Sequence, residues 1–372
     1  MRCPKFNMRG ILIHSKKLDW TLIIFALLLV SIGLLAIYSS SIGRKDFFAF
    51  KKQIVFLGIG FFLMLIISFF DWRLLLEDPY LILILYLLCL VLLGGLFFFA
   101  SEIRGVRSWY KIGPVSFDPI EFTKIVLIIL LAKYFSRRHV EMYRVIHILI
   151  SGFYVFSPAL LIFFQPDLGS VLILLSLWMG ILIISGIKLR HFLVLLLLGV
   201  LILILSWSTI LKDYQKERIL SFIRPQISDP LEVGWSQRQA KIAIGSGGIY
   251  GQGVGKGSQS QYGFLPEPKT DFIFSVIAEE MGLIGVGILL LLFVVLIWRI
   301  LKIAVFSSSN FCRLFAAGFA ILLLSQIFIH IGMNIGLLPI IGVSLPFISY
   351  GGSSLIATFI GLGMLQSMKT NP

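Results

Sequence analysis

The sequence predicts an all-α, polytopic integral membrane protein with about ten transmembrane helices and one large extracytoplasmic loop between the seventh and eighth helices. Hydrophobic residues make up 58% of the 372 residues and charged residues only 13%, which is more apolar than a soluble globular domain. Uncharged apolar stretches of about 20 residues recur along the chain, and each is long enough to cross the hydrocarbon core as a helix. A β-barrel is excluded because its strands would be short and alternating.

The apolar stretches define the elements in order. The predicted spans cover residues 20–40, 53–70, 80–99, 119–136, 145–164, 168–186, 191–210, 271–300, 313–336 and 345–368. The first is too long for a signal-peptide core and no clean cleavage site follows it, so we expect a membrane span there. No internal repeat or linker divides the chain, so residues 1–372 are predicted to form a single domain.

An even number of spans places both termini on one side, and the basic residues indicate which side. With the termini inside, the short inner segments hold 16 Lys and Arg and the short outer segments hold 7. Lys and Arg concentrate in cytoplasmic loops. The sequence therefore predicts cytoplasmic termini and an outer loop at about 211–270.

This outer loop is basic and rich in glycine. Its Gly-Lys pair at Gly255 lacks both the spacing and the following Ser or Thr of a phosphate-binding P-loop, and no strand precedes the glycines as a dinucleotide site requires. We expect an amphipathic helix near 235–244 that presents Arg238 and Lys241 on one side. Two interpretations stay open, a solvated basic loop and a site for an anionic ligand. Nucleic acid is disfavoured because the loop faces outward.

The densest set of polar candidates lies at 101–124. It comprises Arg104, Arg107, Trp109, Lys111, Asp118, Glu121 and Lys124. Glu121 and Lys124 are three residues apart on one helix, so they share a face and can pair. The pair is either a device that makes burial of two charges tolerable, or a cation oriented toward an anionic ligand. Trp109 is either part of this site or an interfacial anchor.

Two aspartates stand at predicted helix starts. Asp167 precedes the sixth span, where it is either only a helix cap or a cap that also supports an active site. Asp271 precedes the eighth span, after the rigid Pro266-Glu267-Pro268 turn, and is either a helix cap or an exposed base. Glu279 and Glu280 lie deeper, and we expect them to be paired or to face a polar cavity.

One exposed carboxylate among many cations suits a lipid-linked phosphate substrate. A departing diphosphate needs neutralisation by cations rather than protonation, so one base with Lys, Arg or Mg²⁺ suffices. No residue is assigned as a metal ligand, and no organic cofactor is expected.

Several motifs resemble those of the SEDS family (shape, elongation, division and sporulation), most closely its RodA branch. They include 104–109 (RGVRSW), 117–124 (FDPIEFTK), 165–169 (QPDLG), 215–229 (QKERILSFIRPQISD), 241–248 (KIAIGSGG), 264–274 (FLPEPKTDFIF), 279–282 (EEMG) and 345–354 (LPFISYGGSS). The chain departs from the family pattern at His330, where Asn is usual, and at Ile341, where Thr is usual.

The resemblance implies a peptidoglycan glycosyltransferase that polymerises lipid II outside the bacterial cytoplasmic membrane. It implies Asp271 as the catalytic carboxylate, with Trp109, Glu121, Lys124 and Asp167 as further functional residues. A class B penicillin-binding protein is the implied partner, beside lipid II, the growing glycan strand and membrane lipid. The chief rival is a lipid II flippase, and a scaffold without chemistry is a third possibility. A role in division or sporulation instead of elongation stays open.

Overall fold

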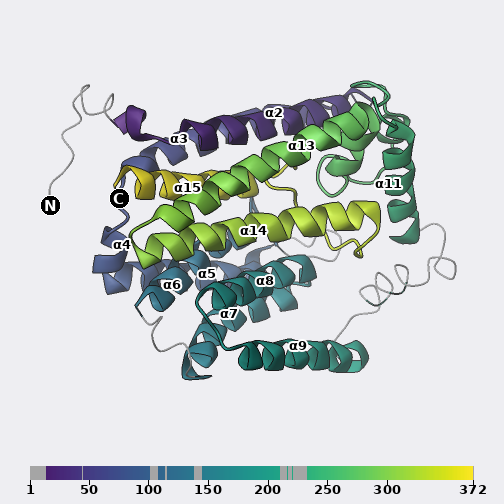
Figure 1. Cartoon of the computed structure of the whole chain (residues 1–372). Helices are drawn as coiled ribbons and strands as arrows, with labels where there is room; N and C mark the ends of the chain where they lie inside the picture. Colours follow the sequence, from purple (N-terminus) through teal and green to yellow (C-terminus); the bar gives the residue numbers. More distant parts are fainter. Residues whose placement is uncertain are drawn as a thin grey trace.

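The computed structural model describes residues 14–43, 45–100, 108–113, 115–137, 145–209, 216, 220 and 233–371. A helix is found at each of the ten predicted spans, although the tenth begins at Gly352 and not at residue 345, and together they form an elongated bundle (Figure 1). These helices are α2 (Trp20–Ile42), α3 (Phe48–Phe69), α5 (Pro79–Phe99), α6 (Pro119–Ser136), α7 (Val145–Phe164), α8 (Leu168–Ile184), α9 (Leu189–Thr209), α13 (Ile273–Phe306), α14 (Asn310–Ile335) and α15 (Gly352–Thr370).

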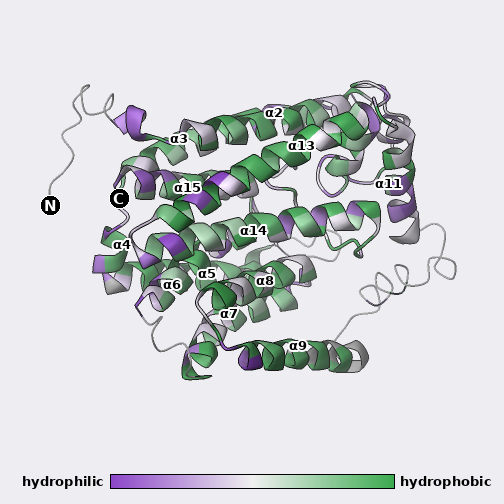
Figure 2. Cartoon of the chain, viewed as in Figure 1, coloured by the Kyte–Doolittle hydropathy of each residue, from purple (hydrophilic) through white to green (hydrophobic). Residues whose placement is uncertain are grey.

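The surface of the bundle is that of a membrane protein. Six helices of the described chain are long and apolar enough to span a membrane by length and composition, namely α2, α3, α5, α7, α13 and α14. Apolar residues run along most of the helix lengths, and polar residues gather toward the ends (Figure 2). Many large apolar side chains are exposed on this surface, which only lipid can solvate favourably.

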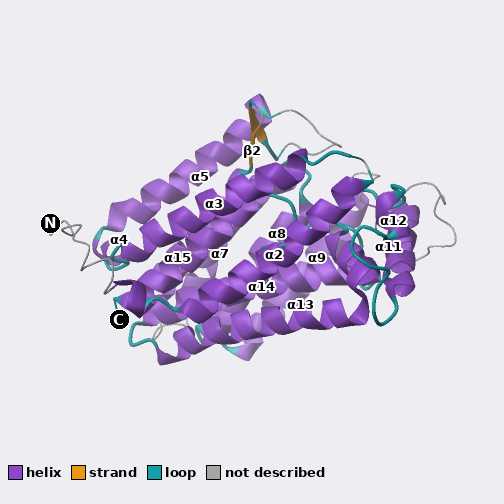
Figure 3. Ribbon diagram, turned by 90° about the horizontal axis from the view of Figure 1, so that it is seen from above, coloured by secondary structure: helices purple, strands orange, loops and turns teal. Residues whose placement is uncertain are grey.

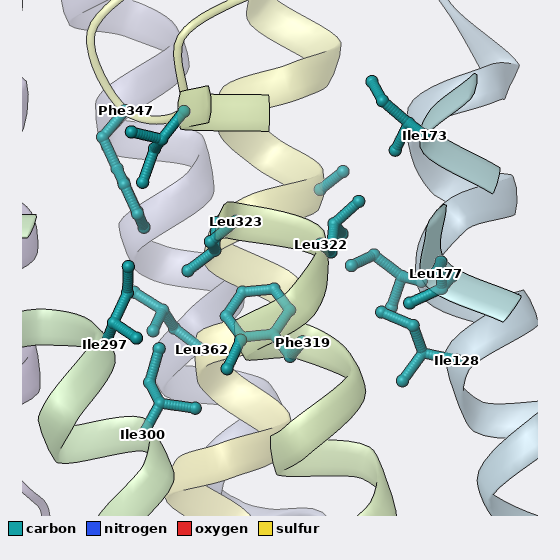
Figure 4. Packing of buried hydrophobic residues seen from close by; sticks show 14 of the residues in the cluster. Ile128, Ile173, Leu177, Ile297, Ile300, Phe319, Leu322, Leu323, Phe347 and Leu362 are labelled. Atoms are coloured by element: carbon teal, nitrogen blue, oxygen red, sulfur yellow. The ribbon is translucent and has the colours of Figure 1, made fainter. Parts of the chain in front are cut away.

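Helix α14 forms the centre of the bundle. In its most apolar window 72% of the residues are buried, against 28–44% for the other five candidate spans. Buried side chains of α6, α8, α13 and α15 surround it, with Phe319 and Leu322 of α14 between them (Figure 4). Small residues allow close approach, as at Gly361, where a Cβ atom would lie 2.3 Å from the Phe319 ring.

Helix α13 is not the single continuous span that the sequence predicts. Its backbone leaves the helical conformation at Gly282, with φ 63° and ψ −164°. Segment 248–253 fills the break: the Gln252 N–H donates to the Glu279 carbonyl at 2.9 Å, and the Leu283 N–H donates to the Gly248 carbonyl at 2.9 Å. Backbone groups that the break exposes are thereby satisfied, as an apolar environment requires.

Short elements cover the end of the bundle opposite the described termini (Figure 3). The predicted amphipathic helix is confirmed as α11 (Val233–Gly247), followed by the single turn α12 (Ser258–Gln261). The two-stranded hairpin of β1 (Tyr110–Ile112) and β2 (Val115–Phe117) was not predicted from the sequence. At the other end, α4 (Leu74–Glu77) is one turn between α3 and α5.

Candidate functional site

The predicted pair on α6 is formed. The Lys124 Nζ atom lies 2.8 Å from Glu121 Oε1, and the side chains are only 2% and 14% exposed. Asp118 precedes the helix and caps it by accepting from the Ile120 N–H at 2.9 Å. Its own N–H donates to Ser353 Oγ at 2.9 Å, which joins the start of α6 to the start of α15.

Asp167 caps α8, as the sequence predicts. Its carboxylate accepts from the Ser170 N–H at 3.0 Å and from the Ser170 hydroxyl at 2.7 Å. Burial raises the pKa of Asp167, although the Ser170 hydrogen bonds and the charge of Lys124 oppose that shift. Lys124 thus lies close to Asp167 as well as to Glu121.

Burial also raises the pKa of Asp118 well above its usual range, with repulsion from Glu121 adding to the shift and the charge of Lys124 opposing it. The predicted residues on α6 and α8 therefore belong to one electrostatic cluster of three carboxyl groups around one amine. Protonation of a carboxyl group whose pKa is raised leaves more of the Lys124 charge for a ligand.

Asp271 does not occupy the N-cap position of α13. The helix begins at Ile273, and the preceding residue is Phe272, which makes no side-chain cap bond. Asp271 is partly exposed. Its carbonyl oxygen accepts from Asn334 Nδ2 at 2.9 Å.

The chain before Asp271 is held at two further carbonyl groups. The Thr270 carbonyl accepts from the Ser349 hydroxyl at 2.9 Å, and the Lys269 carbonyl accepts from the Tyr350 N–H at 2.8 Å. Three successive carbonyl groups are therefore fixed by α14 and by the loop 336–351. These bonds fix the backbone that carries the Asp271 side chain.

Loop 336–351 connects this segment to the α6–α8 cluster. A Cβ atom on Gly169, two residues after Asp167, would lie 2.7 Å from the carbonyl oxygen of Ile341. At its other end the loop leads into Ser353, the partner of Asp118. One loop thus contacts the elements that carry Asp118, Asp167 and Asp271.

Helix α11 carries the basic pair of the outer loop, and both Arg238 and Lys241 are exposed. Gln237 fixes the helix to the end of α14 by donating to the Leu338 carbonyl at 3.0 Å. The Lys241 side chain covers Gly336, the left-handed residue that ends α14. A cation near a helix C-terminus is stabilising, so Lys241 has a structural role there besides any role in binding.

The remaining predicted residues are less informative. Trp109 is partly exposed immediately before β1. Arg104 and Arg107 lie outside the described residues.

Glu279 and Glu280 are buried, and neither is paired with a cation within the described chain. Glu279 accepts from the Gln259 N–H at 2.7 Å and from the Ser260 N–H at 3.2 Å, while Glu280 accepts from the Ser39 hydroxyl. These carboxylates hold segment 255–261 against α13 and α2.

Three side chains that support the segment around Asp271, directly or through loop 336–351, were not predicted from the sequence. Asn334 is fully buried and also accepts from the Ser275 hydroxyl at 2.6 Å. Ser349 is the second, and Gln53 is the third, since its side chain accepts from the Gly351 N–H at 3.3 Å. Ser349 lies in the family-like motif 345–354, and Asn334 ends the Gly332-Met333-Asn334 sequence near the position His330, where the chain departs from the family pattern. These two patterns were the signals in the sequence that could have indicated both residues.

The described part of the chain contains no group of three His, Cys, Asp or Glu side chains that could bind a metal ion without further ligands. Glu121 is bonded to Lys124, and both Asp167 oxygens accept from Ser170. Of the pockets that the structure defines, two are lined by residues at the opposite end of the bundle. The α6–α8 cluster and Asp271 are therefore separate from both.

The similarity to known proteins extends over nearly the whole chain. A family model described as a cell cycle protein of the FtsW, RodA and SpoVE type matches residues 19–372. The peptidoglycan glycosyltransferase MrdB of Escherichia coli K12 is 37% identical over 361 residues, which cover 95% of this chain and 94% of that protein. Stage V sporulation protein E of Bacillus subtilis is 36% identical over 365 residues, covering 94% and 96%.

Solved structures agree with this similarity. A chain from a structure titled as a peptidoglycan synthase complex that coordinates polymerisation and crosslinking matches with a TM-score of 0.80 and 32% identity, covering 95% of this chain and 98% of that one. The rod shape determining protein RodA of Thermus thermophilus matches with a TM-score of 0.71 and 31% identity, covering 95% and 96%.

Proposed function

Because the chain belongs to the family of cell cycle proteins that includes FtsW, RodA and SpoVE, we propose that it polymerises lipid II into β-1,4-linked glycan strands at the outer face of the bacterial cytoplasmic membrane. It is a peptidoglycan glycosyltransferase that serves cell shape. The observation that carries our assignment of the chemistry is the placement of Asp271, a partly exposed carboxylate on a backbone fixed at three successive carbonyl groups.

In the proposed reaction, the growing glycan is the donor and lipid II is the acceptor. The Asp271 carboxylate takes the proton of the acceptor 4-hydroxyl while that oxygen bonds to the donor anomeric carbon. The bond between the anomeric carbon and the lipid diphosphate oxygen breaks, and the diphosphate leaves with the electron pair. Attack opposite to the leaving group inverts the anomeric carbon and yields the β-linkage.

Lys124 is proposed to stabilise the departing diphosphate, with Glu121 fixing the direction of its ammonium group. Charge that develops in the transition state is stabilised best by groups already in place. The 2.8 Å pair, almost closed to solvent, is such a fixed group. We propose as further substrate contacts Trp109, Asp167, Arg104, Arg107, Arg238 and Lys241.

Mg²⁺ remains a proposal, bound through the diphosphate because the described side chains offer no cage. Mg²⁺ is commonly held by one or two carboxylates together with substrate phosphates. We assign no step to it. Removing divalent cations with EDTA should lower polymerisation, and added Mg²⁺ should restore it.

A class B penicillin-binding protein is proposed as the partner that crosslinks the product. The structural relative described as a synthase complex for polymerisation and crosslinking supports this. Cytoplasmic termini are proposed from the distribution of Lys and Arg, and a role in elongation rather than division or sporulation from the RodA-like motifs.

The substitution Asp271→Asn tests the assignment. It keeps the side-chain size, and the bond from Asn334 is unaffected because it reaches the backbone carbonyl. Loss of a general base typically costs about 10²–10⁴-fold in rate. The purified variant, combined with its transpeptidase partner and labelled lipid II, should express normally and make almost no polymer.

Asp46→Asn is the matched control. Asp46 is exposed, belongs to the same end of the bundle and accepts from the Phe48 N–H at 3.0 Å, a bond that Asn can also accept. This variant should polymerise at the wild-type rate. Near-normal polymerisation by Asp271→Asn would remove Asp271 as the base. Lipid II transfer across liposomes without any polymer from the wild type would indicate a flippase instead.

A further inference from the structure

A pocket of about 400 Å³ opens at the end of the bundle opposite Asp271. Residues from the start of α2, the end of α13, the start of α14 and the end of α15 line it, and both described termini lie at this end (Figure 1). The glycosyltransferase chemistry proposed above uses none of these residues.

The pocket carries an excess of two positive charges. Its charged lining residues are Asp19, Arg299, Lys302 and Lys369. Asp19 is buried, and its Oδ2 atom lies 2.7 Å from Arg299 Nε and 2.9 Å from Lys369 Nζ. One carboxylate is thus shared by two cations that remain 23% and 32% exposed.

Lys302 supplies the third cation, and no carboxylate pairs with it within the described ranges. Its ammonium group lies 5.4 Å from the Trp298 ring centroid and 5.9 Å from that of Phe306. Both rings are exposed. Lys302 is therefore held beside aromatic residues of the type that occupy the membrane interface.

The start of α14 adds hydrogen-bond donors to the same pocket. Ser307, Ser308 and Ser309 line it, and Ser309 at the N-cap position makes no side-chain cap bond to the 26-residue helix. The first N–H groups of a helix attract anions. Together with the three cations, these donors favour an anionic group such as a phosphate.

The remaining wall of the pocket is apolar and continues toward lipid. Ile303, Phe306 and Met368 line the pocket. Phe306 is 77% exposed and its neighbour Val305 is 70% exposed. A small water-soluble phosphate would leave this apolar surface uncovered, whereas a ligand with an anionic head and hydrocarbon chains would cover it.

We propose that this pocket binds the phosphate group of an anionic phospholipid, with the acyl chains lying along the exposed face at the end of α13. In the orientation proposed above, the lipid belongs to the cytoplasmic leaflet. Lys302 and the exposed edges of Arg299 and Lys369 contact the phosphate, and the serine hydroxyls donate to it.

The test uses the purified full chain in a zwitterionic detergent. Thermal melting is followed while dihexanoyl phosphatidylglycerol is titrated, with dihexanoyl phosphatidylcholine and sodium phosphate in parallel. Phosphatidylglycerol alone should raise the melting temperature. Lys302→Gln should weaken the apparent affinity about fivefold, as expected for one cation near a lipid phosphate. Lys302 is exposed, so the variant should fold, whereas changes at Arg299 or Lys369 would disturb the buried Asp19.

Arg190→Gln is the matched control, because Arg190 is exposed on α9 at the far side of the bundle from α13 (Figure 1). It should bind phosphatidylglycerol as the wild type does. Equal affinity in Lys302→Gln would show that the pocket is not the site. Equal weakening by Arg190→Gln would show only general attraction between charges. Protection by sodium phosphate alone would replace the lipid with a free anion.

Discussion

Lys124 distinguishes the two interpretations of its pair with Glu121. The pair either binds an anionic ligand or only makes the burial of two charges tolerable, and the two interpretations predict different effects of mutation. Its ammonium group is 2.8 Å from Glu121 and almost inaccessible to solvent. Burial raises the pKa of Asp118 and Asp167, and the charge of Lys124 opposes that shift. A buried pair is weak evidence for a stabilising role, because apolar replacements of both partners are often neutral or stabilising. A role in binding requires the cation itself.

Lys124→Met should therefore reduce polymerisation by about 10²–10³-fold, the cost of removing one fixed group that stabilises transition-state charge. The double variant Glu121→Gln with Lys124→Met should stay inactive, because the cation is still missing. Polymerisation of labelled lipid II measures both. The exposed residue Lys51, which belongs to no candidate site, provides the control, since Lys51→Met should keep full activity. Recovery in the double variant would identify the pair as a burial device.

Local residue contacts could be predicted from the sequence, and distant ones could not. Glu121 and Lys124 are neighbours on any α-helix, and Asp167 caps the helix that follows it directly. The bond from Asn334 to the Asp271 carbonyl joins residues 63 positions apart, and the bond from Asp118 to Ser353 joins residues 235 positions apart. Such pairs depend on how the helices pack, which no local pattern encodes.

At the scale of elements, the break in α13 determines how the outer segments are held. Segment 248–253 bonds to backbone groups on both sides of Gly282. Gly251 makes this approach possible: its φ is +80°, and a Cβ atom there would lie 2.1 Å from the Glu280 carbonyl oxygen. The contact is between two backbone segments, so no flexible side chain can move to make room for a Cβ atom.

Gly251→Ala should lower the melting temperature and the yield of folded protein. The left-handed backbone alone costs an L-residue about 1–2 kcal/mol, and the clash with the Glu280 carbonyl adds to it. Gly245→Ala is the control, because Gly245 lies in α11 with open space around it and alanine favours a helix over glycine. Equal melting temperatures for Gly251→Ala and the wild type would contradict this account of the break.

Hydropathy predicted the ten long helices because each is an apolar stretch with polar ends. It could not predict the break at Gly282, since the residues after it are as apolar as in any span. The hairpin 110–117 was also missed. Its strands have only three residues each, and the Tyr110 hydroxyl, which donates to the Leu92 carbonyl at 2.6 Å, fixes it to α5 by a contact distant in sequence.

At the scale of the whole molecule, the central position of α14 could not be predicted from composition. Lipid is as apolar as a helix surface, so the hydrophobic effect does not order helices within a membrane. Packing of small residues decides, as at Gly318, where a Cβ atom would lie 3.0 Å from Ile181 and 3.1 Å from Ile128. α14 thereby contacts α6 and α8 on one side and α13 on another.

The two ends of the bundle have different chemistry, and their orientation follows from charge. Helices α11 and α12 lie at one end, and the described termini lie at the other (Figure 3). Asp271 stands just before the start of α13, whereas the cationic pocket is lined by residues from the end of α13 and the end of α15. From the 16 to 7 distribution of Lys and Arg in short segments we propose that the end with the termini is cytoplasmic. A glycosyltransferase that acts on the outer face requires this orientation.

Labelling of single cysteines tests it. Tyr262 follows α12 and is 78% exposed, so Tyr262→Cys in a cysteine-free variant should react with a membrane-impermeant maleimide in intact cells. Lys17→Cys, at an exposed position near the start of α2, should react only after the membrane is permeabilised. The two sites lie at opposite ends of the bundle, so labelling of one site and not the other in intact cells identifies the end that faces outward. The reverse pattern would place Asp271 in the cytoplasm, where it could not act on lipid II already moved to the outer leaflet, and both the orientation and the proposed polymerisation would then be wrong.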